Sequence, residues 1–182
     1  MKLLLSFSLA GLCATALFAQ DAPSASKIFD KQIGNVEREV VSLAEAMPAD
    51  KYNFAPTQGA FNGVRTFEQE VKHIAFTIFV VADAMLDQPA PEASGKAENG
   101  PDRIKGKDAT VKYLKDAFAQ AHKAAATLTN DNLMGETADP FDPKGKRTRV
   151  DSVGIFSWHT FDHYGQMVEY ARMNNVIPPA SR

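Results

Sequence analysis

Only one cysteine, Cys13, occurs in the whole sequence, and it lies close to the N-terminus. If the N-terminal segment is removed as a signal peptide, the rest of the chain has no thiol. Such a chain has no disulfide bonds, no cysteine nucleophile and no thiolate metal ligands. A transition-metal site in it must be built from histidine and carboxylate side chains.

The sequence also lacks a large excess of positive or negative charge, with 20 Lys and Arg residues and 22 Asp and Glu residues. We therefore expect neither a nucleic-acid groove nor a polybasic membrane-binding surface. The sequence has no internal repeat. Its 182 residues, 45% of them apolar, suffice for one compact domain with a sizeable core.

The one long apolar run lies at the N-terminus. It extends over residues 3–18, follows the positively charged Lys2 and ends at Ala19, a small residue suited to cleavage. This pattern predicts a signal peptide at residues 1–19 and an exported domain, periplasmic or secreted, at residues 20–182. After cleavage we expect no membrane association.

Two alternatives to cleavage stay open. The run could be an uncleaved anchor, although it is short for a membrane-spanning helix. Cys13 could be lipidated, although Leu12 stands where a lipoprotein signal has a small residue.

Four later segments have apolar residues at intervals of three and four, the period of an amphipathic helix. They span residues 26–47, 66–86, 107–128, and 151 or 152 to about 175. The second segment is apolar over more than half its circumference, so we expect it to be well buried. No segment shows convincing strand alternation, and we predict an all-α four-helix bundle.

Side chains suited to capping mark where these helices begin. Ser26 is the expected N-cap of the first helix, and Thr66 followed by Gln69 has the form of a capping box. Asp151 or Ser152 is expected to cap the fourth helix.

The connection over residues 48–65 carries Tyr52, Phe54 and Phe61. A solvated loop seldom has three aromatic residues, so we expect it to fold onto one end of the domain. It is either a cap over the core or a wall of a pocket.

Two histidines one helical turn apart stand out in the fourth segment. On a helix, His159 and His163 lie on the same side as Phe156, Met167 and Tyr170, which is the face that a helix buries. Buried imidazoles need polar partners, and one metal ion satisfies both. The i, i+4 spacing of two histidines is well suited to holding such an ion.

The other two histidines are expected to differ in role. His73 lies at the margin of the apolar face of the second segment, where a single histidine is more often a packed core residue than a ligand. It becomes a candidate because His159 and His163 need a third ligand. His122 has no second ligand at helical spacing, and we expect it to have no metal role.

These motifs resemble the DinB-like superfamily of helical metalloproteins. The resemblance covers about residues 29–181 and is strongest in three stretches. They are Gly-Val-Arg-Thr-Phe at 63–67 leading to Val-Lys-His-Ile-Ala at 71–75, His-Thr-Phe-Asp-His-Tyr-Gly-Gln at 159–166, and the tail at 170–181. The resemblance implies an up-down-down-up bundle, for which residues 88–106 supply the long crossing between the second and third helices. It also implies a divalent metal, zinc or nickel, held by His73, His159 and His163.

Three histidine ligands with an open coordination position are typical of a working metal site. The resemblance implies a metal-dependent hydrolase or a thiol-type transferase acting on a small molecule. Characterised thiol-using relatives work in the cytoplasm, whereas this chain is expected to be exported. Asp162 lies off the ligand face and could support an imidazole, and Gln166 shares that face and could orient a bound water or cross-link the core.

Other functions stay open at this stage. Since no general acid or base is evident, a non-enzymatic module that captures a metal or small molecule in the cell envelope is the main alternative. A haem protein is another, without covalent attachment because C-x-x-C-H is absent. In the least specific reading, the histidines only pack. A homodimer is compatible with the sequence.

Overall fold

The computed structural model describes residues 23–89 and 98–182. The predicted signal peptide at 1–19, including Cys13, lies outside the described residues, and so does part of the long crossing. Within the described ranges, no helix has the length and apolarity needed to span a membrane.

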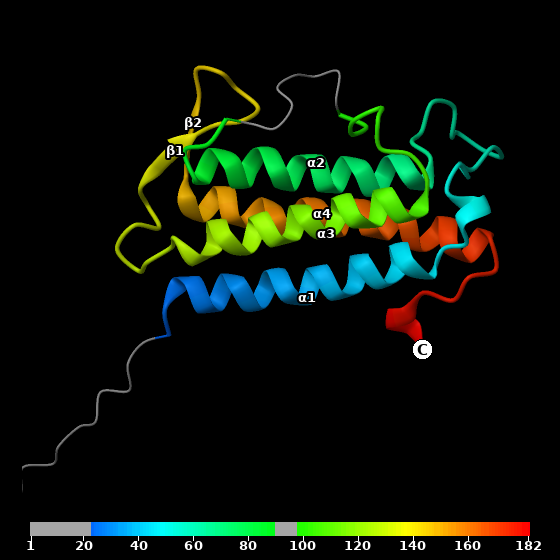
Figure 1. The fold of residues 1–182 in the computed structure, drawn as a ribbon, viewed down its shortest axis with the longest axis horizontal. Helices are drawn as coiled ribbons and strands as arrows, with labels where there is room; N and C mark the ends of the chain where they lie inside the picture. The colour runs from blue at the N-terminus through cyan, green and yellow to red at the C-terminus, as the bar shows by residue number, and fades with distance from the viewer. Residues whose placement is uncertain (1–22, 90–97) are drawn as a thin grey trace, which may run out of the picture.

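Four helices lie side by side in one bundle, as Figure 1 shows. They are α1 (Ala25–Ala46), α2 (Phe67–Met85), α3 (Lys107–Ala126) and α4 (Arg149–Met173). The order of colours along each helix shows that α1 and α4 run in one direction and α2 and α3 in the other. The predicted all-α bundle and its up-down-down-up order are confirmed.

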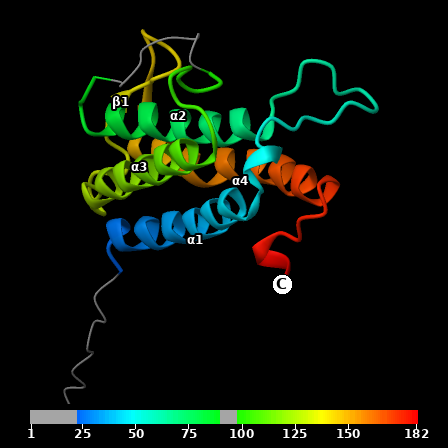
Figure 2. The same cartoon turned by 45° about the vertical axis from the view of Figure 1, so that its right-hand side comes forward.

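Helix α2 is the most buried of the four. It packs against α3 and α4, which lie between it and α1 (Figure 2). Of its 19 residues, 14 are buried, as its wide apolar face predicted. Fully buried side chains such as Phe67 and Ile78 of α2, Phe118 of α3 and Phe156 of α4 fill the centre of the bundle. Because α2 and α4 are neighbours, side chains that face each other across them can meet.

The predicted capping box of α2 is present. The Thr66 side chain accepts a hydrogen bond from the backbone N–H of Gln69, and the Gln69 side chain accepts one from the backbone N–H of Thr66. This arrangement satisfies two N–H groups that have no partner within the helix. It fixes the start of the helix that carries His73.

The predicted N-caps of α1 and α4 were wrong. Ser24, not Ser26, caps α1. Thr148, not Asp151 or Ser152, caps α4. Both helices begin earlier than their apolar patterns do, because their first turns are polar and carry little periodic signal.

A short hairpin contradicts the expectation that the chain has no strands. β1 (Glu136–Ala138) pairs antiparallel with β2 (Lys146–Thr148) across a turn rich in Asp, Pro and Gly. Strands of three residues are too short to show alternation in the sequence. The Thr137 hydroxyl donates to the Ala84 carbonyl at 2.6 Å, which fastens the hairpin to the C-terminal end of α2.

The aromatic connection between α1 and α2, which includes the short helix η1 (Ala49–Lys51), folds back onto the bundle. Tyr52 is buried and donates to the Ala44 carbonyl at 2.6 Å, and Phe54 packs edge-on against the ring of Tyr170. Phe61 is 42% exposed, so its predicted packing was wrong. A second short helix, η2 (Pro179–Ser181), follows α4 near the C-terminus.

Candidate metal centre

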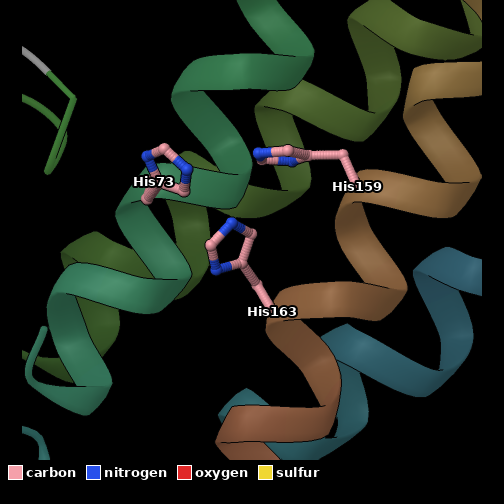
Figure 3. Close-up of side chains that lie close together, drawn as sticks. All are labelled: His73, His159 and His163. Carbon is pink, nitrogen blue, oxygen red and sulfur yellow. The ribbon is translucent and has the colours of Figure 1, made fainter. Parts of the chain in front are cut away.

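Helices α2 and α4 bring three histidine rings together. His73 points from α2 toward His159 and His163 on α4 (Figure 3). Ring nitrogens of the three residues lie within 4.8 Å of one another. The ring centroids are 4.5 Å apart for His73 and His163, 4.6 Å for His159 and His163, and 5.0 Å for His73 and His159. The structure thus assembles the three histidines that the sequence singled out.

His163 is held by a buried carboxylate. Its Nδ1 lies 2.7 Å from Oε2 of Glu70, and the two side chains are only 8% and 2% exposed. Since a carboxylate oxygen accepts hydrogen bonds, Nδ1 is the donor of this bond, and Nε2 is the ring nitrogen that the bond leaves available to a metal. A carboxylate behind a histidine is the usual support of a metal-binding imidazole.

His73 is held in the same way by the main chain. Its Nδ1 hydrogen-bonds to the backbone carbonyl of Glu98, which belongs to the crossing between α2 and α3. Because a carbonyl is also only an acceptor, Nδ1 is the donor and Nε2 is again free. Burial lowers the pKa of His73, although this hydrogen bond opposes the effect. The ring is therefore neutral at physiological pH.

His159 has no such support. Its Nδ1 is buried and lacks a hydrogen-bond partner among the described residues. Burial, followed by the charges of His163, His73 and Arg65, lowers the pKa of His159 to about 3. This neutral ring offers a lone pair, and its buried nitrogen would gain a partner from a bound cation.

The donor set fits a single transition-metal ion. Neutral imidazoles suit zinc, nickel, copper and iron, and a metal can bind them without displacing protons from His73 or His159. Rings whose centroids are 4.5–5.0 Å apart leave room between them for an ion but not for a porphyrin. The geometry therefore argues against the haem alternative.

The carboxylate that supports His163 is Glu70, which was not predicted from the sequence, and not Asp162, which was. Asp162 is exposed, whereas Glu70 is buried against His163. A signal existed, because Glu70 stands three residues before His73 and so shares its side of α2. Gln166 lies with its Nε2 3.4 Å from His163 Nδ1, beside the cluster as its position predicted.

His122 lies apart from the cluster and links α1 to α3. Its Nδ1 is 2.6 Å from a carboxylate oxygen of Asp30, and its Nε2 is 3.2 Å from one of Glu37. Burial alone would lower the pKa of His122, but the hydrogen bonds and charges of the two carboxylates outweigh it and raise the pKa.

This raised pKa predicts a pH-dependent stability. The contribution of protonated His122 is fully present below its unfolded pKa of about 6.5 and is lost as pH rises through the higher folded value. We expect the free energy of unfolding to fall by less than about 1 kcal/mol across that window, since the pair is partly solvated. The lowered pKa values of His73 and His159 have the opposite sign, because they make stability rise with pH, mostly below pH 6.5 and to a smaller extent just above it.

Urea unfolding at pH 6.5 and at pH 8 measures the effect. Since His73 and His159 contribute equally in both proteins, the comparison isolates His122: between the two pH values the metal-free wild type should lose stability relative to the His122→Gln variant. An equal change in the free energy of unfolding between the two pH values in both proteins would contradict the raised pKa of His122.

A polar pocket of about 490 Å³ opens beside the cluster. It is lined by Gly63, Val64, Arg65, Gln69, Glu70, Glu98, Asn99 and Gln166. Two of these residues, Glu70 and Glu98, also hold the rings of His163 and His73. The connection before α2 contributes three of the lining residues, so it is a pocket wall as well as a cap.

Comparison with known proteins identifies the fold. The family model described as the DinB superfamily matches residues 32–167. A DinB-like protein from Bacillus subtilis superposes with a TM-score of 0.61 at 17% identity, covering 85% of this chain and 98% of that chain. A DinB-like protein from Bacillus cereus ATCC 10987 gives a TM-score of 0.58 at 16% identity, covering 84% and 95%. Comparison with curated proteins gave no match.

Proposed function

The chain belongs to the DinB superfamily, and from that premise we propose that it binds one divalent metal ion, zinc or nickel, through His73, His159 and His163. The observation that carries the proposal is the convergence of three ring nitrogens within 4.8 Å. The hydrogen bonds at Nδ1 of His73 and His163 leave Nε2 of both rings available to a metal, which also supports the proposal.

We propose that the site is that of a metal-dependent hydrolase or a thiol-type transferase. A bound ion would supply Lewis acidity and a coordination position that no protein ligand fills. Glu70 and the Glu98 carbonyl keep protons on Nδ1 of His163 and His73 and so orient the rings. The pocket beside the cluster is the space in which a small substrate would lie. The signal-like residues 1–19 support an envelope location for this activity.

One observation favours a passive metal- or ligand-binding module instead. Two carboxylates line the pocket, but that of Glu70 is engaged with His163 and that of Glu98 is 66% exposed. Neither is a buried carboxylate free to act as a general base. A module that only binds would need no such group.

Metal analysis of the purified mature chain tests the proposal. We expect one zinc or nickel ion per chain, removed by a chelator and restored by adding metal. Trp158 provides a second measurement, because it is the only tryptophan and its ring centroid lies 5.7 Å from that of His159. Binding of nickel should quench its fluorescence. A chain that takes up no metal would refute the proposal.

A screen of esters, amides and thiol-dependent electrophiles separates the enzyme from the passive module. Turnover that disappears with the metal and returns with it supports the enzyme. Full metal loading without turnover across the screen favours the module.

A further inference from the structure

The pocket beside the histidines contains a single cationic group among the described residues. Arg65 precedes the N-cap of α2, and its side chain is 27% exposed. Its backbone carbonyl accepts a hydrogen bond from the Tyr170 hydroxyl, which ties this part of the connection to α4. The arginine thus projects from an anchored backbone into a pocket that also reaches the supports of two candidate ligands.

The guanidinium group is only partly engaged. Its Nε donates to Oδ1 of Asn99 at 2.6 Å, which fixes the plane of the group. One terminal nitrogen, Nη2, lies 4.0 Å from Oε2 of Glu98, a long contact with a side chain that is 66% exposed. A planar guanidinium held through Nε presents its remaining N–H groups as a fork that matches a carboxylate.

We propose that this pocket binds the carboxylate of a small substrate through Arg65, with the reacting end of the same molecule directed to the three histidines. The inference rests on the proposed metal site and adds the substrate class to it. The amide side chains of Asn99 and Gln166, which line the same pocket, provide further polar contacts. A single planar negative charge fits better than a phosphate dianion, because Glu70 and Glu98 already place two negative charges around the pocket.

Glu98 competes for Arg65 in the free protein. Its side chain is mostly exposed and can turn outward, while its backbone carbonyl keeps the hydrogen bond to His73. Removing the charge of Glu98 should therefore strengthen carboxylate binding without loosening His73. This expectation separates a binding role of Arg65 from a purely structural ion pair.

Two thiols that differ in one group test the inference on the Co²⁺-loaded mature chain. Both 3-mercaptopropionate and 2-mercaptoethanol offer a sulfur to the metal, but only the first carries a carboxylate. The thiolate-to-cobalt absorption band reports binding of either. We expect 3-mercaptopropionate to bind at least about tenfold more tightly, the size of one charge-assisted hydrogen-bonded pair.

Variants test whether Arg65 causes the preference for 3-mercaptopropionate over 2-mercaptoethanol. Arg65→Gln should abolish it without weakening cobalt binding, and Arg65→Lys should retain part of it. Glu98→Gln should increase it, and Arg172→Gln, a change at an exposed arginine on α4, should leave it intact.

Equal binding of the two thiols by the loaded wild type, or a preference that survives in Arg65→Gln, would overturn the inference and leave the metal site standing. A wild type that shows no cobalt d–d spectrum would overturn both.

Discussion

Replacing His73, His159 or His163 with alanine lowers the affinity for zinc or nickel by at least about 100-fold. Sites of this kind bind with roughly 10 kcal/mol or more, so each of three imidazoles accounts for about 3 kcal/mol. The rings already converge within 4.8 Å, so the loss comes from a missing ligand and not from rearrangement. Competition with a chelating dye measures the change for each variant.

His122→Ala is the matched control, because it removes the fourth histidine of the chain but lies outside the cluster. It should keep the wild-type metal affinity. A variant at His73, His159 or His163 that keeps full metal content would show that the site is misassigned.

His163→Ala should have a second effect that His73→Ala lacks. It leaves the carboxylate of Glu70, whose side chain is 2% exposed, without its hydrogen-bond partner. An unpaired buried acceptor costs about 1–3 kcal/mol, so the metal-free variant should also be less stable by that amount. Urea unfolding of the two metal-free variants compares them directly.

Glu70→Gln should weaken metal binding by about 10- to 100-fold, the usual size of losing a carboxylate behind a ligand histidine. The amide can still accept from Nδ1 of His163, but it lacks the negative charge that makes the imidazole a stronger donor to the metal. Because shape is nearly unchanged, the fold should persist. Isothermal titration calorimetry with Zn²⁺ measures the affinity of each protein.

Asp162→Asn is the control for this change. Asp162 lies between the two α4 ligands in sequence but is exposed, so its replacement should leave the affinity unchanged. If Asp162→Asn weakens binding as much as Glu70→Gln does, the support of His163 is assigned to the wrong carboxylate.

The three histidines could be found from the sequence because their signal is periodic. His159 and His163 share a helix face with residues that prove fully buried, such as Phe156 and Met167. His73 followed from the need for a third ligand and from the family resemblance. Helix spacing and apolar periodicity therefore predicted the bundle and the pair of histidines on α4, but not His73.

The supports of those histidines could not be found in the same way. Glu98 acts on His73 through its backbone carbonyl, a group that every residue has, so the sequence holds no sign of it. Glu70 belongs to a different helix from His163, and only the packing of α2 against α4 brings them together. Arg65 likewise becomes part of the pocket through the fold of a connection, where no period exists.

X-ray absorption at the metal edge of the loaded mature chain tests the metal centre most directly. The account predicts three imidazole nitrogens at about 2.0–2.1 Å from a zinc ion, with the multiple scattering of histidine rings. The His122→Ala protein should give the same spectrum. An ion surrounded by oxygen atoms, or by fewer than three imidazoles, would contradict it.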